Sequence, residues 1–107
     1  MSTAADGRRS EHLVRDDMAS AGWEFGMRAA GSKGAADLLM AHEVHGAALV
    51  QVGRKSKTLG PGDRARLCRL ADLCGALPLL AVHVPRKGIT YWQVTRDVPS
   101  KWERWTA

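Results

Sequence analysis

Two apolar, strand-like segments separated by a single helical segment constrain the fold most strongly. Residues 47–53 and 79–84 are rich in β-branched and aliphatic side chains, as expected of buried strands. Between them, a break at residues 59–63 begins a helix whose apolar residues recur at helical spacing until Gly75 ends it. Such a crossover joins parallel strands and lays its helix on one face of their sheet. These segments therefore predict a mixed α/β sheet.

The rest of the chain adds elements around this unit. Ser10 is a predicted N-cap for a helix over 10–21, in which Val14, Met18 and Ala21 form one apolar stripe. The pattern further predicts strands at residues 23–28, 37–41 and 89–94, a hairpin turn at 43–46, and a short helix in the tail that holds Trp102 and Trp105. We expect an α/β fold with about five strands flanked by helices.

The length of the chain limits it to one core. At 107 residues, two separate cores would each bury too little surface to offset the conformational entropy lost on folding. We therefore expect one domain over residues 1–107, with its core at about 7–95 and a tail at 96–107. No apolar run approaches the roughly 20 residues that cross a bilayer, and the polar start lacks a signal peptide. This indicates a cytoplasmic, nucleoid-associated protein with no membrane partner.

Positive charge is concentrated in one stretch of the sequence. Residues 54–69 contain six basic residues and one acidic residue, an excess equal to the whole net charge of +5. Such a stretch attracts polyanions, and nucleic acid binds it through its phosphates. An ordinary solvated basic face is the alternative. The basic residues are Arg54, Lys55, Lys57, Arg64, Arg66 and Arg69.

Two carboxylates occupy positions where an apolar residue is expected. Glu11 shares a helix face with Val14 and Met18, and a carboxylate there is costly unless it is paired. The alternative is that Glu11 lies at the helix start and complements the helix dipole. Asp37 opens an apolar strand, where Asp is unfavourable, unless it is simply a turn residue.

Gln51 interrupts the apolar strand at residues 47–53. Strand alternation places it on the same side as Leu49 and Gly53. Together with Glu11 and Asp37 it would offer hard oxygen ligands of the kind that Mg²⁺ prefers. Such an ion can generate an attacking hydroxide and stabilise developing negative charge, which is the chemistry of phosphodiester hydrolysis.

Four stretches of the chain carry a family resemblance. Residues 7–11 (GRRSE), 28–38 (RAAGSKGAADL), 49–55 (LVQVGRK) and 79–92 (LLAVHVPRKGITYW) resemble archaeal and phage Holliday-junction resolvases of the restriction-endonuclease-like superfamily. The similarity covers about residues 7–95. The Ser-Lys-Gly that precedes Asp37, at this distance from the helical Glu11, is its most specific part.

The resemblance implies a restriction-endonuclease-like fold and a homodimer whose two subunits cut symmetrical strands of a four-way DNA junction. It implies a Mg²⁺ site in each subunit, for which Mn²⁺ is a possible substitute, and no small-molecule cofactor. By position, Glu11 and Asp37 match the acidic ligands and Ser32 matches a catalytic loop serine. Arg8 or Arg9 matches a residue that contacts DNA.

The third motif departs from the family pattern. The usual acid-x-Lys is Gln51-Val52-Gly53, so a neutral amide replaces an acidic ligand and the lysine is absent from its place. Gln51 can still offer a carbonyl oxygen to a metal. Lys55, two residues further along the strand, can reach back toward the vacated place. Alternatively, it belongs to the phosphate-binding stretch, as we expect of Lys57.

The predicted site contains catalytic and DNA-binding groups. Glu11, Ser32, Asp37, Gln51 and Lys55 are the candidate catalytic residues, and Lys33 lies between two glycines on a loop where a cation can approach a phosphate. Arg8, Arg9, Lys33, Arg54, Lys55, Lys57 and Arg64 are the candidate DNA contacts. These residues favour a Mg²⁺-dependent endodeoxyribonuclease. The alternatives are a junction-binding protein without cleavage, or a related nuclease acting on forks, flaps or mismatches.

Overall fold

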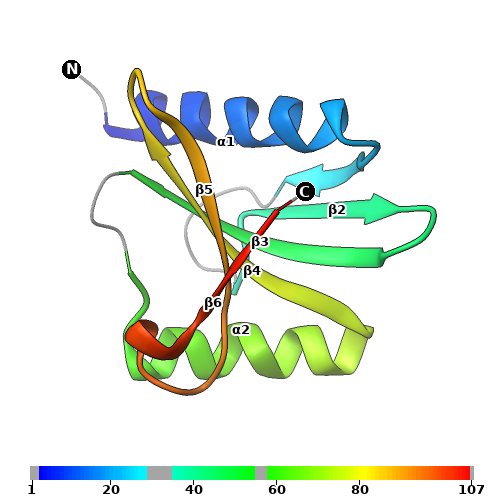
Figure 1. Cartoon of the computed structure of the whole chain (residues 1–107), viewed down its shortest axis with the longest axis vertical. Coiled ribbons are helices and arrows are strands. Elements are labelled where there is room, and N and C mark those ends of the chain that lie inside the picture. The colour runs from blue at the N-terminus through cyan, green and yellow to red at the C-terminus, as the bar shows by residue number, and fades with distance from the viewer. Residues whose placement is uncertain (1–2, 29–34, 55–57, 107) are drawn as a thin grey trace.

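The strands of the sheet lie side by side in the order in which they occur along the chain (Figure 1). A computed structural model describes residues 3–28, 35–54 and 58–106. The elements are α1 (Thr3–Ser20), β1 (Glu24–Arg28), β2 (Leu38–His42), β3 (Gly46–Arg54), α2 (Pro61–Cys74), β4 (Ala76–Val84), β5 (Gly88–Gln93), a single 3-10 turn (Pro99–Lys101) and β6 (Glu103–Trp105). No helix among these residues is long and apolar enough to cross a membrane.

The predicted crossover is confirmed. β3 and β4 are parallel and are joined through α2, whereas every other neighbouring pair of strands in the sheet is antiparallel. Pro61 stands in the first turn of α2, where its missing N–H costs nothing. Gly75 ends the helix in the left-handed conformation, with φ of 66°.

The sheet is covered on both faces, by α1 on one and α2 on the other (Figure 1). Val50 of β3 packs in the core that contains Val14 and Met18 of α1. Leu49, its neighbour along the strand, packs in a second core with Leu67 of α2. Because successive residues of a strand point to opposite faces, one central strand contributes to both cores. The apolar interior is thus two layers, one on each face of the sheet, in place of the one core expected from the length.

Helix α1 begins earlier than predicted. It starts at Thr3, so Ser10 lies within the helix and is not its N-cap, and Ala21 lies beyond its end and is exposed. The buried stripe is formed by Ser10, Val14 and Met18, each four residues apart. A serine can occupy this stripe because its Oγ lies 3.2 Å from Nδ1 of His83 on β4.

The tail forms a sixth strand in place of the predicted helix. β6 pairs with β5, and only the short 3-10 turn before it is helical. Trp102 is buried in the α2-side core and donates its indole N–H to the carbonyl of Asp97 at 3.0 Å. Trp105 packs edge-on against Tyr91 on the α1 side, with ring centroids 5.4 Å apart. The extended backbone thus places the two tryptophans in different cores, whereas the predicted helix would have put them on one face.

A buried phenol ties α1 to β5. The Tyr91 hydroxyl donates to the Asp17 carboxylate at 2.6 Å. Burial, reinforced by this hydrogen bond, raises the pKa of Tyr91 well above its ordinary value. Tyr91 is the only tyrosine of the chain, so its ionisation can be followed directly.

This environment predicts a loss of stability at alkaline pH. In the unfolded chain the phenol titrates near pH 10, whereas in the folded chain it stays protonated above that pH. The stability it contributes is therefore intact below about pH 10 and falls as the pH rises further. In urea unfolding at a series of pH values, Tyr91→Phe should lose roughly 1 kcal/mol at neutral pH. Above pH 10 the free energy of unfolding of Tyr91→Phe should then decline less steeply than that of the wild type. Equal declines, or a tyrosinate absorbance that appears before unfolding, would contradict the hydrogen-bonded, protonated state of Tyr91.

Candidate active site

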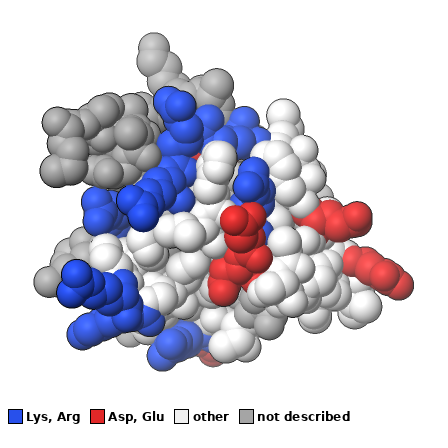
Figure 2. Space-filling model, turned by 90° about the horizontal axis from the view of Figure 1, so that it is seen from above, with Lys and Arg blue, Asp and Glu red and all other residues white. Residues whose placement is uncertain are grey.

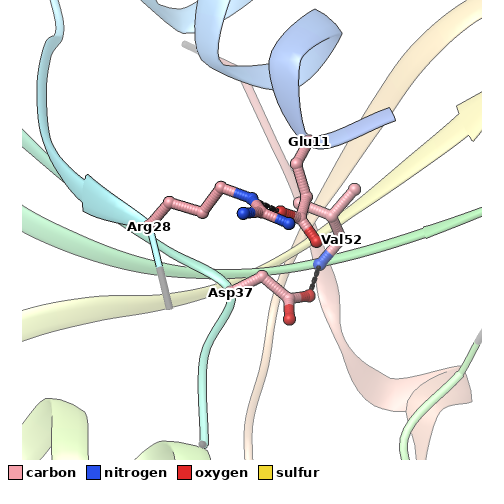
Figure 3. Close-up of polar contacts among 4 residues, drawn as sticks. All are labelled: Glu11, Arg28, Asp37 and Val52. Atoms are coloured by element: carbon pink, nitrogen blue, oxygen red, sulfur yellow. Dashed lines mark hydrogen bonds and ion pairs between the residues drawn. The ribbon is translucent and has the colours of Figure 1, made fainter. Parts of the chain in front are cut away.

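Glu11 lies beside the buried stripe of α1 and is paired with Arg28. Its side chain is only 14% exposed, and one carboxylate oxygen forms an ion pair with Nε of Arg28, the last residue of β1 (Figure 3). Glu11 is eight residues into the helix, so the alternative of a carboxylate at the helix start is wrong. The free-energy cost of burying this carboxylate is offset by the guanidinium of Arg28 on the sheet.

Asp37 extends the ladder between β2 and β3. Its backbone N–H donates to Val50 O at 2.9 Å, and its side-chain Oδ2 accepts the Val52 N–H at 2.8 Å (Figure 3). The carboxylate therefore replaces a backbone carbonyl at the point where β2 begins. An aspartate is suited to this strand start because its short side chain folds back onto the neighbouring backbone.

Gln51 bonds to the segment that leads into β2. Its amide nitrogen donates to Ala35 O at 2.7 Å, so the side-chain carbonyl is not used in this hydrogen bond. By alternation it lies on the side of Leu49, as predicted, and this side faces α2. The structure thus places Gln51 close to the Asp37 segment, whereas Glu11 approaches β3 from the opposite face.

The two carboxylates point toward the same stretch of β3, around Val52 (Figure 3). Carboxylate and amide oxygens suit a hard divalent cation, so these donors fit Mg²⁺ in type. Among the residues that the structure describes, however, no three His, Cys, Asp or Glu side chains are grouped as metal ligands. To bind an ion, Glu11 would share its carboxylate between the metal and Arg28.

Basic side chains gather on one part of the α1 face, apart from most of the acidic ones (Figure 2). Arg8 and Arg9 are exposed on α1, and Arg54 is exposed at the end of β3. Arg54 and Arg9 line one pocket on this side of the sheet. The predicted residues Ser32, Lys33, Lys55 and Lys57 lie outside the described residues.

The basic stretch at residues 54–69 is divided between the two faces of the sheet. Arg54 lies on the α1 side, but Arg64, Arg66 and Arg69 belong to α2. Arg64 is half-buried and donates to Leu59 O at 3.2 Å and to Arg96 O at 3.3 Å, so it connects the start of α2 to the segment after β5. Its contact with DNA stays a prediction. Arg66 is paired with Asp63 at 2.6 Å.

Sequence reasoning missed Arg28, which directly contacts a candidate catalytic residue. A signal was available, because a carboxylate on a buried stripe requires a cationic partner. Several arginines could have met that need, and only the packing of α1 on the sheet selects the one at the end of β1.

No protein-family model matches the sequence, and no curated protein matches it. Among solved structures, that of Archaeoglobus fulgidus Hjc, a Holliday junction resolvase from an archaeal hyperthermophile, aligns with a TM-score of 0.70 and 20% sequence identity. The alignment covers 81% of this chain and 76% of that chain. The restriction-endonuclease-like fold implied by the sequence resemblance is thus confirmed, with six strands in place of about five.

The Asp37–Val52 bond predicts a difference between two substitutions. Asp37→Ala leaves the Val52 N–H without its acceptor and should cost about 1–3 kcal/mol of unfolding free energy. Asp37→Asn keeps an acceptor oxygen and should cost much less. Urea denaturation of both variants measures this, and equal losses would show that the carboxylate does not hold the ladder.

Proposed function

We propose that this chain is a structure-selective DNA endonuclease that resolves four-way junctions by metal-dependent phosphodiester hydrolysis, as a homodimer in the cytoplasm. The observation that carries the proposal is that the carboxylates of Glu11 and Asp37 both point toward the stretch of β3 around Val52 (Figure 3). The fold shared with Hjc, which is a Holliday junction resolvase, supports the choice of branched DNA as substrate.

In this proposal Glu11 and Asp37 would hold a divalent cation, Mg²⁺ or Mn²⁺, and Gln51 would support Asp37 from the other face of β3 through its hydrogen bond to Ala35 O. Such an ion lowers the pKa of a bound water and stabilises charge on the phosphate. Arg28 already contacts Glu11, so its guanidinium is close enough to the cleavage site to neutralise a phosphate oxygen. Lys55 would orient the attacking water in place of the lysine missing at Gly53, and Ser32 and Lys33 would contact the bound strand.

The proposal predicts metal-dependent cleavage of a labelled four-way junction. Nicks should appear at symmetrical positions in two strands with Mg²⁺ or Mn²⁺, and linear duplex, fork, flap and mismatch substrates should be cut less. Glu11→Gln and Asp37→Asn should each reduce the rate by roughly 10- to 100-fold or more through lost metal affinity.

Asp16→Asn is the matched control for this experiment. Asp16 is an exposed carboxylate on the same helix, paired with Arg15 at 3.3 Å, and its loss should leave cleavage unchanged. Junctions that remain uncut with both metals across a range of pH would exclude the endonuclease. Better cleavage of a fork, flap or mismatch would instead identify the related nuclease.

One observation favours a second function, junction binding without cleavage. Gly53 and Gln51 stand where the resolvases that the sequence resembles have a lysine and an acid, and no group of three His, Cys, Asp or Glu ligands occurs among the described residues. Such a protein would bind junctions tightly, selectively and with strong salt dependence.

Lysine substitutions separate the two functions. If the protein only binds, Gly53→Lys should create cleavage by restoring a cation at the motif position. If Lys55 has taken over the role, Lys55→Ala should abolish nicking while Lys57→Ala retains it. Nicking that survives Lys55→Ala would exclude lysine migration, and junction binding measured in parallel controls for loss of affinity.

A further inference from the structure

A basic pocket lies on the α1 side of the sheet, where the first half of α1 passes the ends of β3 and β4. Its volume is about 300 Å³, and its lining includes Arg9 and Ser10 of α1, Arg54 of β3, His83 of β4 and Arg86 of the following turn. We propose that this pocket binds a phosphate group of nucleic acid. The proposal rests on the DNA-binding function proposed above and assigns it a specific subsite.

The sheet register brings the pocket's polar groups together. Arg54 and His83 are paired across the parallel β3–β4 ladder, so they lie side by side at the carboxyl ends of the two strands. Ligands of α/β proteins commonly bind at this end of parallel strands. α1 crosses the same place and contributes Arg9 and Ser10.

The charge of the pocket favours an anion. Three arginines line it, and none of its described lining residues is acidic. The pocket lies on the α1 side, the face on which Figure 2 shows basic side chains gathered. The planar guanidinium group matches a phosphate through paired hydrogen bonds, so arginines from three elements suit this ligand.

A polar pair forms part of the lining where apolar residues would pack. Ser10 continues the stripe of Val14 and Met18 and is 3% exposed, and His83 follows Ala81 on the same side of β4. Their contact, at 3.2 Å, engages Nδ1 of His83. Nε2 is then the ring nitrogen that a bound phosphate would meet, and it can donate a hydrogen bond.

The turn after β4 carries the third arginine in a strained conformation. Arg86 has φ of 70°, in the left-handed region, and it is the only residue other than glycine with positive φ in the described part of the chain. Such conformations favour glycine or asparagine, and strain of this kind is concentrated at functional sites. Here the strained residue is one whose guanidinium lines the pocket.

The pocket adjoins the proposed cleavage site. Ser10 in the pocket and Glu11 in the candidate active site are consecutive residues of α1. A phosphate held by Arg9, Arg54 and Arg86 would therefore position the nucleic acid next to the carboxylates.

Inorganic phosphate is the first probe, because it tests the pocket without DNA or cleavage. In the wild-type protein, titration should shift the NMR signals of the His83 ring. Arg86→Gly should weaken this response about tenfold or more through loss of a charge-assisted hydrogen bond. Glycine adopts positive φ without strain, so this variant should fold at least as well, which its thermal unfolding verifies.

Lys87→Gln is the matched control, because it removes the same charge from the neighbouring turn residue, which does not line the pocket. Its phosphate response should equal that of the wild type. Unchanged His83 signals, or equal weakening in Arg86→Gly and Lys87→Gln, would overturn the proposal. Glu11→Gln should retain phosphate binding. A failure of the endonuclease proposal can therefore be distinguished from a failure of the phosphate-pocket proposal.

Four-way junctions with 5′-hydroxyl or 5′-phosphate ends identify the source of the phosphate. For an internal phosphodiester, Arg86→Gly should weaken binding to both junctions and reduce the slope of log affinity against log salt by about 0.9. For a terminal phosphate, the weakening should be confined to the phosphorylated ends. Full binding by Arg86→Gly to both junctions would contradict a nucleic-acid subsite.

Discussion

The parallel register between β3 and β4 is the constraint on which the rest of the structure depends. It runs from the pair Ala47 and Ala76 to the pair Arg54 and His83 without interruption. Both strands are central and covered on both faces, so a slip of one residue would exchange every apolar side chain between the two cores. This register places Arg54 beside His83, and the antiparallel pairing of β3 with β2 places Val52 next to the start of β2. The candidate active site and the phosphate pocket therefore both depend on how β3 is aligned with its neighbours.

Polar contacts attach α1 to this sheet at three successive places. The Ser10 contact with His83, the Glu11 ion pair with Arg28 and the Asp17 hydrogen bond with Tyr91 engage β4, β1 and β5 respectively. Val14 and Met18 supply the apolar burial between them. Burial alone is not directional, whereas each polar contact requires one partner at one distance. Together they define the axial position and rotation of the helix on the sheet.

The Glu11–Arg28 pair links stability to the proposed chemistry. A carboxylate that is 14% exposed needs a cation, and Arg28 supplies it in the free protein. A bound metal or a DNA phosphate would each compete for one member of this pair, since the metal attracts Glu11 and the phosphate attracts Arg28. Binding of both ligands would satisfy both residues at once.

The sequence by itself determined the order of elements, the parallel crossover through α2 and the unusual positions of Glu11 and Asp37. These are local properties, because side-chain periodicity and Gly or Pro breaks act over a few residues. Only the tertiary structure decided that the tail adds β6, that Ser10 is buried rather than capping, and that the basic stretch at 54–69 is divided between two faces. It also selected Arg28 as the partner of Glu11 and brought Arg86 to Arg9 and Arg54. Each of these depends on contacts between residues far apart in the chain, and side-chain alternation along one strand carries no information about which distant element will cover it.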